Sequence, residues 1–151
     1  MVSKEQFEFQ IWRVNMRTKT LQREAVPESW NHLGGRGLSA RILLDETDPL
    51  CDPMGARNKL VFAPGLLVGH MLSSTDRISI GGKSPLTGGI KEANAGGRTG
   101  LQMSHLGIKA LILEDQPAEP GWWVMLGSRP PRAERSHPWR NCRTPEGPRE
   151  R

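Results

Sequence analysis

The stretch KSPLTGGIKEANAGGRTG, residues 83–100, says more about this chain than any other part of its sequence. Seven of the 17 glycines lie between positions 81 and 100. Because glycine has no Cβ, such a backbone can bring amide N–H groups close to a bulky, oxygen-rich anion. Asn94 stands just before a glycine pair. Positive charge is added nearby by Arg77, Lys83, Lys91 and Arg98. We therefore expect the main chain of residues 81–97 to form a cup for a phosphate-bearing cofactor.

Hydrophobic patterns on both sides of this stretch predict short strands and helices. Alternation at 7–14 and 20–26, with a turn between them, predicts a β-hairpin. Pro27 is placed to start a short helix that the glycines at 34–35 would end. Further strands are expected at 59–63, 77–80, 109–113 and 122–126, and further helices at 38–46 and 99–106.

Charge and composition divide the chain near residue 128. A net charge of +5 and a pI of about 9.8 favour nucleic-acid binding only if the charge lies on a folded surface. Residues 128–151 hold seven arginines against three glutamates, and seven of the 12 prolines follow position 116. We predict a nearly neutral folded domain at 1–127 and a disordered basic tail at 128–151. Nucleic-acid binding by the tail is disfavoured because Trp139 is its one aromatic residue.

Several site types and compartments are disfavoured by the residues that this chain lacks. Cys51 and Cys142 have no partner at metal-ligand spacing, so this chain alone predicts no disulfide framework, zinc site or iron–sulfur site. The four histidines stand singly and are expected to be solvated or core residues. The sequence shows neither an apolar run of membrane-span length nor signal-peptide features, so we expect a cytoplasmic protein.

A resemblance to a known family rests on three runs of sequence: GGRGLSARILL (34–44), DPMGARNKLVFAPGLLVG (52–69) and DRISIGGKSPLTGGIKEANAGG (76–97). In order, and from about residue 7 to about 123, the chain resembles the N-terminal domain of the aldehyde ferredoxin oxidoreductase family. Members of that family are tungsten or molybdenum enzymes with a bis-pterin cofactor. The resemblance implies an α+β fold of mostly antiparallel β-sheets with short helices, incomplete at its C-terminal end. Two sheets would form the base on which the pterins rest.

The resemblance also implies roles for individual residues. Arg77 matches an arginine between the pterin and an iron–sulfur cluster, where a planar guanidinium can bridge two groups. Asn94 matches an asparagine whose backbone carbonyl holds a magnesium ion shared by the pterin phosphates. Gly96 matches a glycine that lets a phosphate reach the main chain. The expected cofactor-binding set is Arg77, Asn94, Ala95, Gly96 and Gly97, and no catalytic residue is assigned.

Nearby charged residues receive weaker expectations. Asp76 stands where the family commonly has a small residue, and its carboxylate would be placed to pair with Arg77 and weaken the cofactor contact. Glu92 is not expected to form an acid pair with Asp76. Arg36 and Arg41 are expected to be surface or packing residues.

The function implied by the resemblance is the cofactor-binding part of an enzyme that converts an aldehyde and water to a carboxylic acid. Electrons would pass through a 4Fe–4S cluster to ferredoxin. The cluster cysteines and the substrate region of the family lie beyond the matched part, so we expect the chain to be inactive alone. A truncation, a frameshift and a genuine short protein are the alternatives for its length. Expected partners are ferredoxin and the missing domains, with a homodimer left open and no membrane. The alternative is a non-catalytic module that docks with a separately encoded catalytic subunit.

Overall fold

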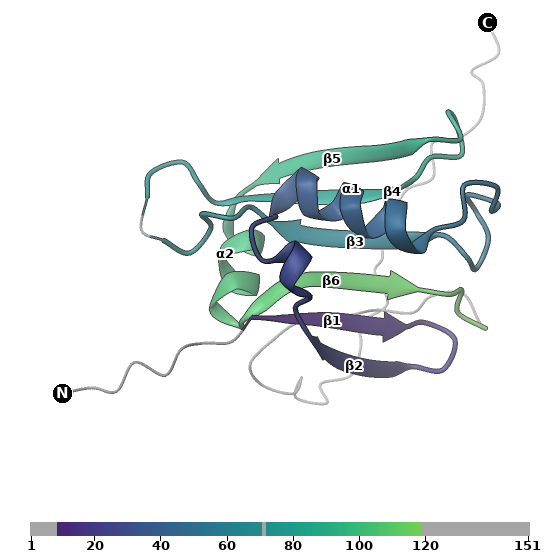
Figure 1. The fold of residues 1–151 in the computed structure, drawn as a ribbon, viewed down its shortest axis with the longest axis horizontal. Coiled ribbons are helices and arrows are strands. Elements are labelled where there is room, and N and C mark those ends of the chain that lie inside the picture. The colour runs from purple at the N-terminus through teal and green to yellow at the C-terminus, as the bar shows by residue number, and fades with distance from the viewer. Residues whose placement is uncertain (1–8, 71, 119–151) are drawn as a thin grey trace, which may run out of the picture.

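The computed structural model describes residues 9–70 and 72–118, which form one six-stranded mixed β-sheet with two α-helices (Figure 1). The strand order is β2-β1-β6-β3-β4-β5. The strands are β1 (Gln10–Asn15), β2 (Thr20–Ala25), β3 (Lys59–Pro64), β4 (Arg77–Lys83), β5 (Ile90–Gly96) and β6 (Ile108–Glu114). Neighbouring strands of the described sheet are antiparallel except for β1 and β6. The α+β prediction with mostly antiparallel pairing is therefore confirmed, but the described residues form one sheet where the resemblance implied two.

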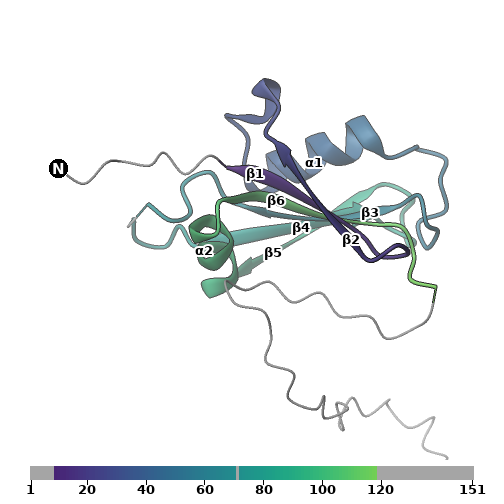
Figure 2. The same cartoon turned by 90° about the horizontal axis from the view of Figure 1, so that it is seen from below.

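The two α-helices lie on opposite faces of the sheet (Figure 2). Helix α1 (Gly35–Glu46) covers one face and helix α2 (Arg98–His105) covers part of the other. A 3-10 turn, η1 (Glu28–Trp30), connects β2 to α1. Side chains therefore alternate along each strand between an α1 side and an α2 side.

The main core lies between α1 and the sheet. Leu38 and Ile42 are one helical turn apart and fully buried, so both point at the strands below. This core consists of Ile11, Trp30, Leu38, Ile42, Leu43, Val61, Ala63, Ala110 and Ile112. A second cluster under α2 contains Ile78, Met103, Ile108 and Leu111. Ile78 in the second cluster anchors β4, the strand at the start of the glycine-rich stretch, against α2.

One predicted boundary is wrong. The glycines at 34–35 begin α1 instead of ending the turn before it, with Gly34 as the N-cap residue in an extended conformation. A Cβ on Gly34 would lie 2.4 Å from the backbone nitrogen of Leu66. The glycine is needed because the loop after β3 passes close to the start of the helix.

The other described elements follow the predictions closely. The hairpin, the strands at 59–63, 77–80 and 109–113 and both helices are present, although α1 starts three residues earlier than predicted and β4 extends to Lys83. The predicted strand at 122–126 and the tail at 128–151 lie outside the described residues. Neither described helix combines the length and apolar character that a membrane-crossing helix requires.

Candidate functional site

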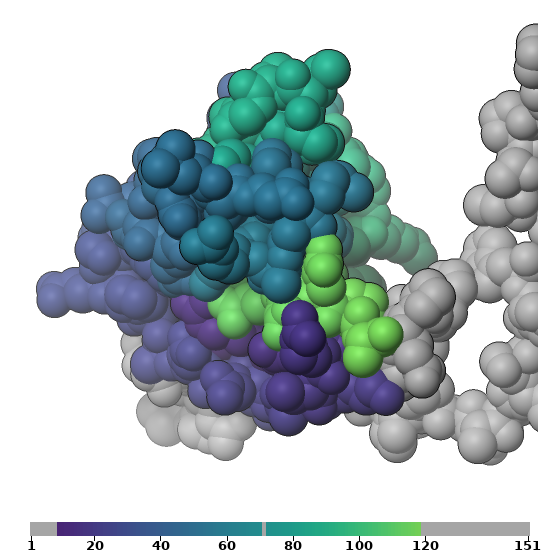
Figure 3. All heavy atoms as spheres, turned by 90° about the vertical axis from the view of Figure 1, so that its right-hand side faces the viewer, coloured from purple at the N-terminus to yellow at the C-terminus, as the bar shows by residue number. Residues whose placement is uncertain are grey.

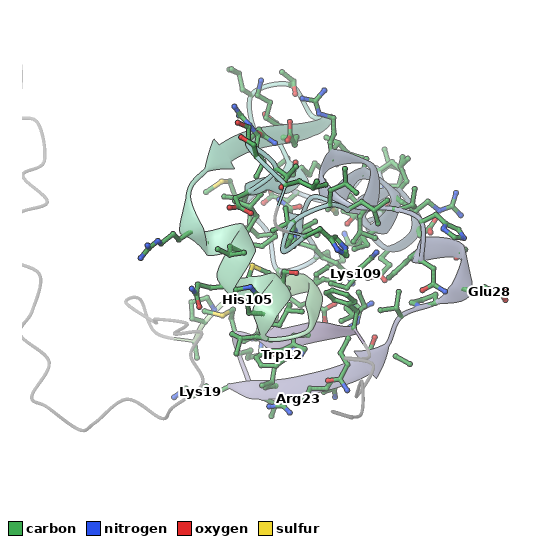
Figure 4. The ribbon with its side chains drawn as sticks, turned by 90° about the vertical axis from the view of Figure 1, so that its left-hand side faces the viewer. Trp12, Lys19, Arg23, Glu28, His105 and Lys109 are labelled. Atoms are coloured by element: carbon green, nitrogen blue, oxygen red, sulfur yellow. The ribbon has the colours of Figure 1, made fainter. Side chains whose placement is uncertain are left out.

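The structure brings the predicted site residues together where β4 begins and β5 ends. Arg77 of β4 lies directly opposite Gly96 of β5 in the antiparallel register, and Asn94 lies opposite Ser79. Nη1 of Arg77 donates a hydrogen bond to Oδ1 of Asn94 over 3.0 Å. Figure 4 looks at this end of the sheet, where the chain leaves β5 and enters α2. Arg77, Asn94 and Gly96, which are up to 19 positions apart, therefore share one surface.

The main chain of Asn94 faces the open edge of the sheet. The backbone nitrogen of Gly65 donates to the carbonyl oxygen of Arg77 over 3.0 Å, so the polar groups of Arg77 face β3. Ser79, two residues further along β4, directs its main-chain N–H and C=O groups to the same side as Arg77 and pairs with β3. In an antiparallel pair, two directly opposite residues either both bond to each other or both direct their main-chain groups away from each other. Because Arg77 and Ser79 face β3, the opposite residues Gly96 and Asn94 direct their main-chain N–H and C=O groups away from β4. Because β5 is the last strand of the sheet, these groups point off its edge.

Space is free beside Gly96. No heavy atom lies within 4 Å of the position that a Cβ on Gly96 would occupy. Gly97 has a φ of 110°, a conformation that other residues rarely adopt, and it caps α2. The N-terminus of α2 therefore lies beside the open edge, where its unpaired N–H groups favour an anion.

Two other expectations fare differently. Ala95 lies opposite Ile78 in the alternate phase, so its main chain faces β4 and not the open edge. Lys83 lies at the other end of the hairpin, where Nζ donates to the carbonyl oxygens of Pro49 and Cys51. The positive charge of Lys83 is therefore absent from the site. Residues 81–97 form a two-stranded hairpin where the sequence suggested a cup, and contact with a phosphate stays a prediction.

Three polar residues that sequence reasoning did not assign to the site belong to its hydrogen-bond network. The Ser79 hydroxyl accepts from Nδ2 of Asn94 at 3.3 Å and donates to Oε1 of Glu92 at 2.6 Å. Nε of Arg36, in the first turn of α1, donates to Oε2 of Glu92 at 3.1 Å. The Ser79 hydrogen bond, helped by Arg36, lowers the pKa of Glu92. A spacing of two along each strand, Arg77 to Ser79 and Glu92 to Asn94, is the signal that could have found them.

The carboxylate of Asp76, which the sequence placed to compete for Arg77, forms no ion pair with it within the described ranges. Arg77 turns to Asn94 instead. Within those ranges, no cluster of three or more His, Cys, Asp or Glu side chains could hold a metal ion. The site therefore offers a guanidinium, an amide side chain, outward main-chain oxygens and a helix N-terminus.

Other cations visible in Figure 4 have contacts elsewhere. The Arg23 guanidinium lies 4.6 Å from the centre of the Trp12 ring on the neighbouring strand. Nζ of Lys109 donates to the carbonyl oxygen of Asn31 over 2.9 Å, and burial lowers the pKa of Lys109. These two side chains stabilise β1, β2 and the connection to α1, whereas the Arg77 guanidinium bonds to Asn94 on the edge strand β5. Lys91 of β5 and Arg98 at the start of α2 are also exposed.

Comparison with protein families gives a match over most of the chain. The family model described as aldehyde ferredoxin oxidoreductase, N-terminal domain, matches residues 11–129. The tungsten-containing aldehyde ferredoxin oxidoreductase of Thermococcus kodakarensis is 36% identical over 131 residues, and that of Pyrococcus furiosus is 35% identical over 131 residues. Each match covers 84% of this chain and 21% of the relative. The chain thus spans about a fifth of the length of these curated relatives.

A solved structure gives the same result for the fold. The active-site complex BamBC of benzoyl coenzyme A reductase, solved with 1,5-dienoyl-CoA, superposes with a TM-score of 0.69 at 27% identity. The match covers 73% of this chain and 17% of the other. The matched part of the fold therefore also occurs as a small part of a much larger reductase complex.

Proposed function

Because the chain belongs to the family of aldehyde ferredoxin oxidoreductase N-terminal domains, we propose that it forms one wall of the tungsten–pterin pocket of such an enzyme. One observation carries this proposal. Arg77, Asn94 and Gly96 converge at a sheet edge whose main-chain oxygens point outward and beside which space is free. Convergence of residues so far apart in sequence is what a cofactor wall requires.

The residues present fit the phosphate end of such a cofactor. The outward carbonyl oxygen of Asn94 is a hard ligand of the kind that magnesium prefers. The free space beside Gly96 and the N-terminus of α2 suit a phosphate group. Arg77 has donors beyond the one given to Asn94, and a guanidinium binds planar polar groups in fixed directions. When bound, the tungsten centre would supply the two-electron oxidation chemistry, whereas these residues bind and orient its ligand.

The whole enzyme would convert an aldehyde and water to a carboxylic acid, two protons and two electrons. The electrons would leave through a 4Fe–4S cluster to ferredoxin, a coupling that also supports a cytoplasmic location. This chain spans about a fifth of the relatives' length and contains two cysteines, too few to ligate such a cluster. We therefore propose that it contributes cofactor binding and requires the remaining domains for turnover.

The test measures cofactor retention. The chain is co-expressed in tungstate medium with the Thermococcus kodakarensis relative from which the matched region has been removed. We expect the purified complex to contain tungsten and pterin, measured by mass spectrometry. Gly96→Val should lower both more than tenfold, because the side chain fills the space meant for the phosphate. Ala93→Val is the matched control, since its side chain lies on the same strand but on the other sheet face.

Two results would contradict the proposal. One is a stable complex of the wild-type chain without tungsten or pterin. The other is equal cofactor content in Gly96→Val and Ala93→Val. Thermal unfolding of both variants controls for loss of the fold, which neither change is expected to cause because Ala93 and Gly96 are both exposed.

The second candidate function is a docking module for a separately encoded catalytic subunit. An apolar surface at the far end of the sheet favours it: Leu50 and Leu86 are 91% and 92% exposed, and Leu44 is largely exposed. Between the C-terminal end of α1 and the β4–β5 hairpin lies a groove of about 300 Å³, and Thr47 is one of the residues that line it. The Thr47 Oγ1 atom is buried there without a hydrogen-bond partner among the described residues. Figure 3 shows this end, with the hairpin above the loop after α1.

Co-purification of the chain and its surface variants tests the docking function. A docking module should retain a partner that carries the cysteine cluster and tungsten, and the double variant Leu50→Asp/Leu86→Asp should abolish that retention. Leu67→Asp serves as the control, because Leu67 is exposed in the loop between β3 and β4. Retention of the partner by the double variant would exclude this surface as the docking site.

A further inference from the structure

We propose that Glu92 and Ser79 are positioning residues that fix the direction of the Arg77 guanidinium through Asn94. The four residues form a continuous hydrogen-bonded chain, called here the Arg77 relay. Its links are Glu92 to Ser79 at 2.6 Å, Ser79 to Asn94 at 3.3 Å and Asn94 to Arg77 at 3.0 Å. The inference rests on the proposed function, since orienting Arg77 matters for cofactor binding only if Arg77 contacts the cofactor.

Register and burial hold the centre of the relay in place. Ser79 is 1% exposed and lies directly opposite Asn94, so their side chains share one face of two adjacent strands. Glu92 lies opposite Gly81, on the same face and two residues before Asn94. A Cβ on Gly81 would lie 3.2 Å from the Ser39 side chain of α1, so a glycine at that position lets the helix pack close to this part of the sheet. The relay thus lies flat on β4 and β5 beneath the first turn of α1.

The direction of every hydrogen bond in the relay follows from the charge on Glu92. A carboxylate only accepts hydrogen bonds, so the single hydroxyl proton of Ser79 goes to Glu92. The Ser79 oxygen can then only accept from Asn94, which turns the Asn94 NH₂ group toward Ser79. This leaves Oδ1 of Asn94 as the acceptor that meets Arg77. If the amide were reversed, its NH₂ group would face the guanidinium, and two donors cannot bond to one another.

Helix α1 contacts the acceptor end of the relay through Arg36. Nε of Arg36 pairs with the second carboxylate oxygen of Glu92 at 3.1 Å and leaves the first oxygen for Ser79. Arg36 is 76% exposed, so water can replace much of its effect. We therefore expect Glu92 and Ser79 to dominate the relay and Arg36 to contribute little.

The test reads the Arg77 side chain directly, by ¹⁵N NMR of its guanidinium in the wild-type chain without cofactor. We expect hindered rotation about the Nε–Cζ bond. Ser79→Ala and Glu92→Gln should each speed this rotation by about tenfold, the ratio expected for loss of one hydrogen bond to a charged group. Glu92→Gln is the sharper variant, because its shape is preserved while its amide can donate to Ser79 and reverse the chain. Arg36→Ala is the control and should leave the rotation rate within about twofold.

The outcomes distinguish this inference from the proposed function. If Arg77 rotates equally in wild type, Ser79→Ala and Glu92→Gln, the relay is wrong, whatever the tungsten content of the Gly96→Val complex. If Arg77 is released in both variants but Gly96→Val retains tungsten and pterin, the relay stands and the proposed function fails. Unfolding curves of the same samples exclude a general loss of structure as the cause of faster rotation.

Discussion

Two charged networks lie at opposite ends of α1, and they differ in whether their charges are all paired within the fold. At the C-terminal end of the helix, Arg13 and Lys59 both contact Glu46 and Glu114, with distances between 2.6 and 2.8 Å. We call these four residues the closed cluster. At the N-terminal end, Arg36 pairs with Glu92, and the Arg77 relay continues from there to the sheet edge.

The closed cluster ties four elements together. Its members come from β1, α1, β3 and β6, and each cation contacts both carboxylates. The side chain of Arg13 is 15% exposed, so its charge depends on these partners instead of water. The Arg77 relay ends differently, in a guanidinium at the surface with donors left over. We infer that the closed cluster maintains the fold, whereas the relay leaves a surface guanidinium available for a contact outside it.

Helix α1 makes both networks necessary. Arg36 lies in its first turn and Glu46 is its last residue, so each charge has the sign that the helix dipole disfavours. Glu46 is compensated by Arg13 and Lys59, and Arg36 is compensated by Glu92. Each of these ion pairs also joins α1 to the sheet. The charges that the helix dipole disfavours therefore fix the position of the helix on the strands.

The largest expected effect is that of Arg13→Ala on stability. Removal of Arg13 leaves Glu46 and Glu114 half-buried with Lys59 as their shared cation. We expect the free energy of unfolding to fall by about 3 kcal/mol, the cost of breaking a buried charge network from one side. Urea unfolding of the whole chain measures it.

The control for Arg13→Ala is Arg41→Ala. Arg41 pairs with Asp45 one turn away on the exposed side of α1, at 2.8 Å. Such a pair contributes about 0.3–0.5 kcal/mol. Equal losses in the two variants would show that the closed cluster is an ordinary surface network that contributes no more than the Arg41–Asp45 pair.

The second expected effect is a loss of stability in acid that comes from the closed cluster. Burial raises the pKa of Glu46 and of Glu114, but hydrogen bonds from Arg13 and Lys59 outweigh it and hold both pKa values below the usual range. A lowered folded-state pKa gives stability that is present above the unfolded value of about 4.3 and is lost as the pH falls through the folded value.

The measurement is the free energy of unfolding by urea between pH 6 and pH 2. We expect a decline that begins below about pH 4.3 and is shallower in Glu46→Gln, which has no carboxylate to protonate. Glu92 also has a lowered pKa and contributes in the same window. A decline of equal steepness in wild type and Glu46→Gln would place the acid sensitivity outside the closed cluster.

Sequence predicted the elements better than the contacts between them. The strands at 59–63 and 109–113 were evident from their apolar runs, because burial on both faces requires such composition. The parallel pairing of β1 with β6 was not predicted, since no local pattern sets which distant strands meet. The sequence predicted that Gly34 ends a helix, because the contact that requires a glycine there is made by the backbone of Leu66, 32 positions away.

The candidate site shows the same limit. Arg77, Asn94 and Gly96 were found through the family resemblance, and the structure places them side by side. The sequence did not identify Ser79 and Glu92, because a serine and a glutamate on two neighbouring strands look like ordinary surface residues until the register of the strands is known. Lys83 was expected at the site because it is near in sequence, yet it lies at the turn end of the β4–β5 hairpin, whereas Arg77 lies at the opposite end of β4.

The third expected effect is a moderate loss of stability in Ser79→Ala. The change removes a hydroxyl that joins Glu92 and Asn94 beneath α1, and Asn94 can turn to water at the exposed edge. We expect a loss of about 1 kcal/mol in urea unfolding. A loss as large as that of Arg13→Ala would mean that the relay stabilises the fold as strongly as the closed cluster does.

The smallest expected effect is that of Arg36→Ala. Loss of the contact with Glu92 costs little because the Arg36 side chain is 76% exposed. Loss of a positive charge from the first turn of α1 is favourable by a few tenths of a kcal/mol, about 0.3. The two terms oppose each other, so the free energy of unfolding should change by less than about 0.5 kcal/mol.

Arg36→Ala also fixes the boundary between the two networks. Arg36 and Arg13 each form an ion pair that joins an end of α1 to the sheet, and they differ chiefly in exposure and in the number of carboxylates they contact. If exposure decides the outcome, the ratio of the two losses in unfolding free energy should exceed about five. A ratio near one would mean that the helix ends are equally tied to the sheet, and the open edge at Arg77 would then be part of the structural frame rather than a surface set aside for a ligand.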